Sequence, residues 1–267
     1  MTIEATTKVL GLGGALLALA AGPEVGVGGL PLEAGSILAI ADFAPLDTLI
    51  EYSADGELRG SVEVNDPGAL IDHANGLAIA GGTLWAATRT EVVRVDPATG
   101  AVTPGFPVSE SALLTGLADD GDTLLVTELA PDRVHRFTLG GRLLGTVLLP
   151  GGLLITGVDT DGTLLYVTSH NTGHVHVFTM DGRPTGVVEM GLTGDLTGVT
   201  LDADGESLWV ATGTGLNDLL HVDFAGNVLG GFPGDVQGVM GLHAVSSPLF
   251  ADGFESGDLA AWSETRP

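Results

Sequence analysis

The chain has 267 residues, and its 9 basic and 34 acidic side chains give a net charge of −25 at pH 7. This charge argues against nucleic acids and anionic membrane surfaces as partners, because both would repel the protein. The absence of cysteine excludes disulfides, thiolate metal sites and cysteine nucleophiles, while 44% apolar residues allow a sizeable core.

The first segment in chain order is an apolar run at residues 9–21. The run is too short to cross a membrane, but it has the length of a signal-peptide core, and Ala18-Leu19-Ala20 fits a cleavage site. Because Glu4 weakens the positive charge before the run, a stray strand or disordered leader is the alternative. We expect a signal peptide at 1–21, a leader at 22–34 and a secreted or periplasmic protein without integral membrane association.

A glycine followed by Leu or Val then recurs every 40 to 43 residues. It stands at Gly76, Gly116, Gly157, Gly198 and Gly241. Each repeat holds about four short apolar or β-branched runs separated by Gly- and Asp-rich turns, which is typical of antiparallel strands. Four strands in each repeat of this length predict an all-β fold, the β-propeller.

The repeats also predict how the ring closes. They divide residues 35–249 into units near 35–74, 75–114, 115–155, 156–196 and 197–239, with a closing strand at 240–245. The first unit lacks an innermost strand, and the closing strand has no blade after it. Pairing the two removes exposed edges. We predict five four-stranded blades, or six if residues 8–33 add strands, and an acidic tail at 250–267.

Propeller geometry places two sets of loops on one face, which we call the loop face. They are the loops from the outermost strand of one blade to the innermost strand of the next, and those between the second and third strands of a blade. Loops on a rigid scaffold commonly carry binding residues. The candidate ligand-binding side chains there are Asp42, His73, Asn75, Arg89, Glu128, His170, Asn171 and Asp218. The alternative is that these side chains are merely solvated.

Two other patterns have simpler explanations than a metal site. His170, His174 and His176 are close in sequence, but His176 falls in a column that recurs on the third strand of each blade. The other members of this column are Glu51, Arg94, His135 and His221. The acidic turns at 119–122, 159–162 and 202–205 lack the further ligands of a calcium hand, and Asp-Gly is itself a hairpin signal.

Residues 165–182, LYVTSHNTGHVHVFTMDG, resemble the NHL/YVTN-type propeller repeat, and the resemblance covers residues 35–245. The segment NGLAIAGGTLW (75–85) is similar to part of the senescence-marker-protein/gluconolactonase family of lactone-hydrolysing, six-bladed propellers. That resemblance implies calcium as a cofactor and Asn75 as its ligand. The tail FADGFESG, followed by a Trp, resembles terminal segments of secreted bacterial proteins, which implies export.

Three functions stay open at this stage, because a propeller fold alone does not choose one. We expect an exported bacterial binding scaffold, a monomer that holds a protein, peptide or glycan on its loop face. The alternative is a calcium-dependent lactonase or esterase. The third is an acidic surface component that takes up calcium at many weak sites. Catalytic residues are not identified, since neither a G-x-S-x-G nor an H-E-x-x-H motif occurs.

Overall fold

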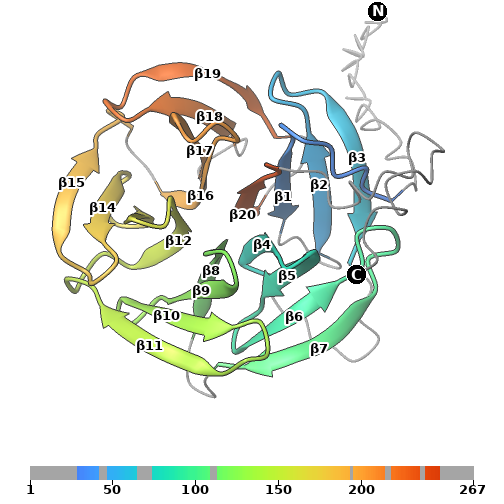
Figure 1. The fold of residues 1–267 in the computed structure, drawn as a ribbon. Coiled ribbons are helices and arrows are strands. Elements are labelled where there is room, and N and C mark those ends of the chain that lie inside the picture. The colour runs from blue at the N-terminus through green and yellow to red at the C-terminus, as the bar shows by residue number, and fades with distance from the viewer. Residues whose placement is uncertain are drawn as a thin grey trace, which may run out of the picture.

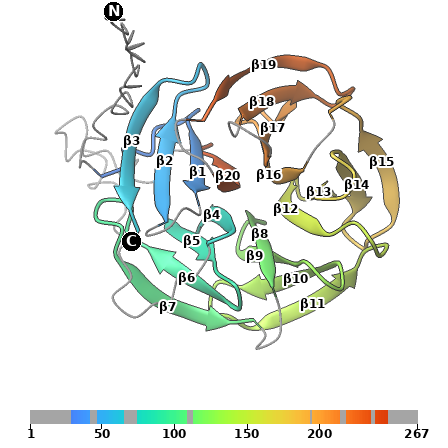
Figure 2. The same cartoon turned by 180° about the vertical axis from the view of Figure 1, so that it is seen from behind.

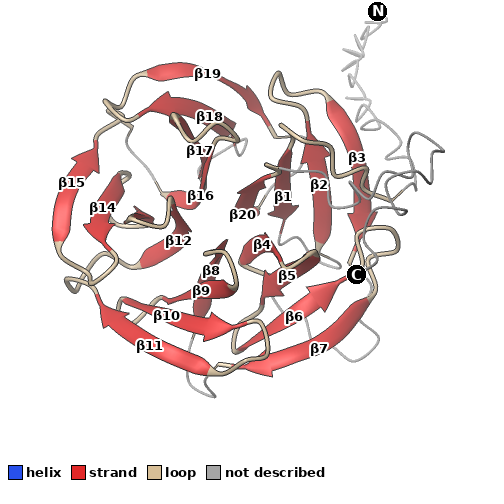
Figure 3. Cartoon of the chain, viewed as in Figure 1, coloured by secondary structure: helices blue, strands red, loops and turns tan. Residues whose placement is uncertain are grey.

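The computed structural model describes residues 29–41, 47–64, 74–108, 113–192, 195–213, 218–234 and 238–246. Within these ranges every regular element is a strand (Figure 3). The predicted signal peptide, most of the predicted leader and the predicted acidic tail lie outside the described residues. No helix in the described part of the chain has the length and apolar character needed to span a membrane.

The strands form five antiparallel four-stranded sheets that radiate from one axis, which makes the protein a five-bladed β-propeller, as predicted (Figures 1 and 2). From the axis outward, blade 1 consists of β20 (Val239–Ala244), β1 (Ile37–Ala41), β2 (Thr48–Tyr52) and β3 (Leu58–Glu63). Blade 2 consists of β4 (Gly76–Ala80), β5 (Thr83–Ala87), β6 (Glu91–Val95) and β7 (Val102–Pro107). Blade 3 consists of β8 (Leu114–Asp119), β9 (Thr123–Glu128), β10 (Arg133–Thr138) and β11 (Leu143–Leu148). Blade 4 consists of β12 (Ile155–Thr160), β13 (Leu164–Ser169), β14 (Val175–Thr179) and β15 (Pro184–Val188). Blade 5 consists of β16 (Leu196–Leu201), β17 (Ser207–Thr212), β18 (Asp218–Asp223) and β19 (Val228–Pro233).

Blade 1 closes the ring with strands from opposite ends of the described chain. Strand β20 pairs with β1, and Ile37 stands opposite Ala244. The predicted closing strand is therefore confirmed, and it begins one residue earlier than expected. This pairing covers an inner edge of β1 that would otherwise present unpaired backbone groups.

The recurring glycines lie where the innermost strands β4, β8, β12, β16 and β20 approach one another. A Cβ built on Gly116 would lie 2.9 Å from the Cα of Gly157, and one on Gly157 would lie 3.0 Å from the Cα of Gly198. One on Gly241 would lie 2.8 Å from the Cα of Gly76, which continues the ring across the closure. The glycine column thus lets five backbones meet around the axis, where a side chain would force them apart.

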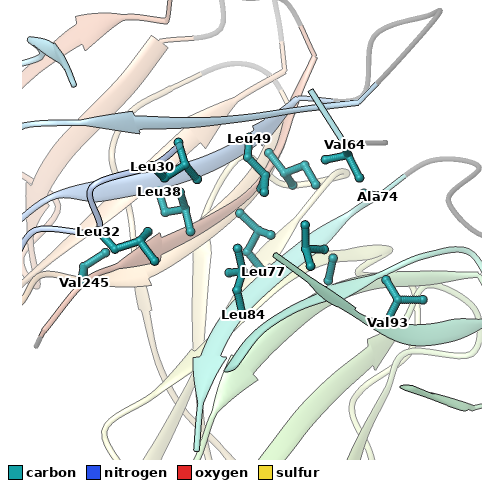
Figure 4. Packing of buried hydrophobic residues seen from close by; sticks show 13 residues of the cluster. Leu30, Leu32, Leu38, Leu49, Val64, Ala74, Leu77, Leu84, Val93 and Val245 are labelled. Atoms are coloured by element: carbon teal, nitrogen blue, oxygen red, sulfur yellow. The ribbon is translucent and has the colours of Figure 1, made fainter. Parts of the chain in front are cut away.

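Residues of the predicted leader complete the core between blades 1 and 2. Leu30 and Leu32 are 5% and 0% exposed, and they pack with Leu38, Leu77 and Leu84 (Figure 4). Burying two such side chains contributes about 3–6 kcal/mol to folding. In three of the other four blade interfaces the second strand of a blade contributes a large aromatic side chain. These are Trp85 in blade 2, Tyr166 in blade 4 and Trp209 in blade 5.

The carboxylate of Glu51 on β2 holds this segment in place. Its Oε2 accepts from the backbone N–H of Leu32 at 2.7 Å, and its Oε1 accepts from the N–H of Glu33 at 2.8 Å. The hydroxyl of Ser36 donates to the same Oε1 at 2.7 Å. Glu51 is completely buried. Three donors compensate the cost of removing the carboxylate from water.

Strand pairing corrects the predicted polar column on the third strands. Glu51 pairs with Leu38, and His221 pairs with Trp209. Both pairs lie level with the residue two positions after the recurring glycine of the innermost strand of their blade. Arg94 stands at the same level, opposite Trp85. His135 and His176 pair one residue earlier, so their side chains point to the opposite face of their blades. The predicted column therefore divides into two sets.

Candidate functional site

Asn75 belongs to a set of hydrogen bonds that tie each inner strand to the next. Its Nδ2 donates to the carbonyl of Leu114 at 2.9 Å. The residue before the axial glycine makes the same kind of bond in the next three blades. Thr115, Thr156 and Thr197 donate to the carbonyls of Ile155, Leu196 and Val239 at 2.7, 2.6 and 2.6 Å, respectively. The Asn and the three Thr residues are therefore structural equivalents.

The structure brings three of the predicted residues together around Leu114, at the beginning of β8. Besides the bond from Asn75, the N–H of Leu114 donates to the carbonyl of Arg89 at 3.0 Å. Glu128 pairs with Leu114 across the β8–β9 ladder. Arg89 is exposed, whereas Glu128 is 5% exposed. The side chains of Glu128 and Asn75 are thus parts of the blade interface rather than free loop groups.

A pocket of about 340 Å³ opens on the loop face beside Glu128. Residues 129–132, between β9 and β10, line one side, and residues from 148–154, between β11 and β12, line the other. Its lining is largely apolar and includes Leu129, Leu148 and Leu154. This volume is at the lower end of the range for small-ligand sites and suits one large apolar group.

The loop between β11 and β12, which lines one side of this pocket, is held in place by a residue of blade 3. The Asp132 carboxylate accepts the N–H groups of Leu153 and Ile155, both at 3.1 Å, and Asp132 is 3% exposed. Leu154 between them has φ of 51°, in a region that costs a leucine about 1–3 kcal/mol. Such a conformation persists only where surrounding contacts enforce it.

Blade 4 holds the same loop from the other side, and two predicted residues take part. Asn171 Nδ2 donates to the carbonyl of Gly152 at 2.9 Å, and the backbone N–H of His170 donates to the carbonyl of Leu154 at 3.0 Å. The Ser169 hydroxyl donates to the carbonyl of Leu153. The pocket is therefore formed before any partner arrives.

Asp218 and the ring of His170 do not line this pocket. Asp218 begins β18 in blade 5, and its N–H donates to the Thr212 hydroxyl at 3.2 Å. The ring of His170 lies 3.5 Å from an Asp195 carboxylate oxygen and is half exposed. Asp42 and His73 lie outside the described residues.

Sequence reasoning missed a polar chain that runs outward from Glu128 across blade 3. Glu128 Oε2 lies 3.0 Å from His135 Nε2, and His135 Nδ1 lies 2.9 Å from Thr146 Oγ1. Arg133 Nη1 also approaches Glu128 Oε2, at 3.4 Å. Only the strand register reveals this chain, because His135 and Thr146 face each other across the β10–β11 ladder.

The surroundings of Asn75 do not fit a calcium site within the described residues. Calcium takes six to eight oxygen ligands. The amide nitrogen of Asn75 instead donates to a carbonyl, as its threonine equivalents do. In the described part of the chain, no three His, Asp or Glu side chains are placed to hold a metal ion. Calcium binding through Asn75 stays a prediction.

The turn face, which is the face opposite the loop face, carries two carboxyl groups whose pKa values are raised. Burial raises the pKa of Asp119 to about 6, and the nearby Asp159 charge adds to the shift. Burial also raises the pKa of Asp159 to about 6, although Leu201 N–H and the Thr200 hydroxyl donate to it. The Oδ1 atom of Asp119 is buried and lacks a hydrogen-bond partner.

The acidic turns beside these carboxylates are hairpins, as predicted, and their glycines adopt positive φ. Gly121, Gly162 and Gly205 have φ of 68°, 81° and 73°. In the turn before β13, Asp161 Oδ1 accepts the N–H groups of Thr163 and Leu164, each at 2.7 Å. The turn thus uses its aspartate to fix its own backbone.

Comparison with known proteins supports the fold and nothing finer. The chain matches no model of a known protein family and no curated protein sequence. A chain in a crystal structure of a nidogen/laminin complex is similar with a TM-score of 0.55 and 17% identity, over 80% of this chain and 100% of that one. A Bacteroides caccae protein of unknown function gives 0.49 and 11%, covering 79% and 98%. Myxococcus xanthus glutaminyl cyclase gives 0.46 and 16%, covering 73% and 76%. The NHL-type and gluconolactonase-like resemblances stay predictions.

Proposed function

We propose that this protein is an exported binding scaffold that takes an apolar side chain of a protein or peptide into the loop-face pocket. The observation that carries the proposal is the rigid support of the pocket loop. Asp132 binds it from blade 3, and Ser169 and Asn171 bind it from blade 4. A preformed pocket loses little entropy on binding, so even one inserted side chain yields useful affinity.

The charge of the protein indicates what should surround that side chain. A net charge of −25 attracts cationic partners and repels acidic ones. The pocket itself is mainly apolar. The matching partner is therefore a peptide segment with Leu, Met or Phe flanked by Lys or Arg.

A phage-displayed random peptide library, selected on the full chain, tests this proposal. We expect enrichment of apolar residues flanked by basic ones, and a synthetic peptide made from the consensus is then titrated by calorimetry. Leu148, which lines the pocket, is 65% exposed, so Leu148→Glu should leave the fold intact. It should weaken peptide binding about tenfold or more, because it places a charge at an apolar contact.

Leu144→Glu provides the matched control. Leu144 lies on the same strand, is 44% exposed and is not part of the pocket lining. It introduces the same charge and should leave the affinity nearly unchanged. Equal weakening by both variants, or selected peptides that bind Leu148→Glu as tightly as the wild type, would show that the pocket is not the binding site.

A further inference from the structure

Blade 3 contains a hydroxyl, an imidazole and a carboxylate joined in that order. Thr146 Oγ1 lies 2.9 Å from His135 Nδ1, and His135 Nε2 lies 3.0 Å from Glu128 Oε2. The three residues lie on adjacent strands, β11, β10 and β9. Their side chains share one face of the sheet, because His135 pairs with both Thr146 and Val126, and Glu128 follows Val126 by two residues.

The acceptor properties of Glu128 determine the direction of these bonds. An ionised carboxylate only accepts hydrogen bonds, so the proton of a neutral His135 must be on Nε2. Nδ1 is then the acceptor, and the hydroxyl of Thr146 donates to it. This is the arrangement in which an imidazole removes a proton from an attacking hydroxyl.

The three side chains become more exposed in order from the Glu128 carboxylate through His135 to the Thr146 hydroxyl. The side chains of Glu128 and His135 are 7% and 11% exposed, whereas Thr146 is exposed on the outermost strand. The carboxylate and imidazole are thus shielded from water, and the hydroxyl can be reached from solvent.

Two neighbours on the same face supply what an acyl substrate needs. Leu148 follows Thr146 by two residues, about 7 Å along the strand, and lines the apolar pocket. Arg133 precedes His135 by two residues, contacts Glu128 and keeps 42% of its side chain exposed. Its guanidinium carries N–H donors of the kind that stabilise negative charge on a carbonyl oxygen.

We propose that Thr146 is the nucleophile of an acyl-transfer site that hydrolyses esters with an apolar acyl group. Thr146 Oγ bonds to the ester carbonyl carbon while His135 Nδ1 takes its proton. The bond from that carbon to the leaving alkoxide then breaks, and His135 returns the proton to the alcohol. Water attacks the acyl-threonine in the same way, which releases the carboxylic acid and restores the hydroxyl.

This activity goes beyond peptide binding and is tested with the full chain and p-nitrophenyl butyrate. The wild type should hydrolyse the ester faster than the buffer blank. Thr146→Val keeps the shape and β-propensity of the side chain but removes the hydroxyl, so hydrolysis should fall by about a hundredfold or more. Thr146→Ser keeps the hydroxyl and should retain activity.

A fluorophosphonate probe provides a second readout that a structural role would not produce. Mass spectrometry should find the phosphonyl adduct on Thr146 in the wild type and no adduct there in Thr146→Val. Hydrolysis no faster than the blank, equal hydrolysis by both proteins, or no adduct on Thr146 would each overturn the proposal. Peptide binding should survive in Thr146→Val, so failure here is distinguishable from failure of the binding function.

Discussion

Asn75 occupies the position that threonine occupies in the next three blades, and this allows its role to be tested by exchange. Asn75→Thr should keep a donor to the Leu114 carbonyl and leave the free energy of unfolding within about 0.5 kcal/mol of the wild type. Asn75→Ala leaves that carbonyl without its donor and should cost about 1–3 kcal/mol. Urea unfolding measures both. If Asn75 acts as a calcium ligand instead, Asn75→Thr will reduce calcium-dependent stabilisation.

Asp119 should make the protein less stable at neutral pH than at mildly acidic pH. Its folded pKa of about 6 lies above the usual 3.8, so the folded state binds the proton more tightly. Its favourable contribution is complete below pH 3.8 and is lost as the pH rises through about 6. Asp119→Asn should therefore raise the melting temperature at pH 7.5 and change it little near pH 4.

The comparison with Asp119→Asn also separates this effect from that of His243. Burial lowers the pKa of His243 to about 4, so its favourable contribution is present above pH 6.5 and is lost as the pH falls through about 4. Both proteins contain His243, so its contribution cancels in their difference. A difference in melting temperature that is constant from pH 4 to pH 7.5 would contradict the role given to Asp119.

At the scale of the element, the ring of inner strands should be intolerant of any side chain at the axial glycines. A Cβ on Gly116 would meet Thr127 Oγ1 at 2.7 Å and the Cα of Gly157 at 2.9 Å. Gly116→Ala must push two blades apart and should destabilise the fold by about 1–3 kcal/mol or more, measured by urea unfolding.

Gly186, on the outer strand of blade 4, is the matched control for this substitution. It lies within a strand as Gly116 does, but a Cβ built there has no atom within 4 Å. Gly186→Ala should be neutral or slightly stabilising, because alanine reduces the entropy of the unfolded chain. Equal losses at both positions would mean that close approach at the axis is not the reason for the glycine column.

The strands and their order could be predicted because their signals are local. A glycine column and turns rich in Asp and Gly recur along the chain, and the missing inner strand of the first blade indicated closure by the last strand. Contacts that depend on register could not be predicted. A shift of one residue reverses a side chain, so His135 was placed in one column with His221 although the two side chains point to opposite faces.

The packing of the leader and the bond between His135 and Thr146 were missed for a related reason. Leu30 and Leu32 do not belong to the repeat pattern. They are buried in a space between blades 1 and 2 that exists only once the ring has assembled. Glu128 was predicted as a candidate from its loop position. Its partners could not be, because strand pairing and not sequence proximity brings them together.

For the whole molecule, charge repulsion should make stability depend on salt. A net charge of −25 opposes compaction, and dissolved ions screen repulsion between exposed charges. We expect the melting temperature to rise by several degrees between about 0.05 M and about 1 M NaCl at pH 7.5. The rise should shrink near pH 4.5, where part of the carboxylates is protonated. A melting temperature that stays flat or falls with added salt would contradict this expectation.

The closure of blade 1 also has a consequence for the order of events during synthesis. A ribosome releases β1 near the start of the described chain, whereas its inner neighbour β20 begins only at Val239. Until that strand emerges, the nascent protein carries a sheet with an open inner edge, which is a template for wrong pairing. The blades encoded between β1 and β20 can form as they are synthesised. The ring cannot close until translation has passed Ala244. A chaperone that kept the unfinished chain unfolded would remove that hazard.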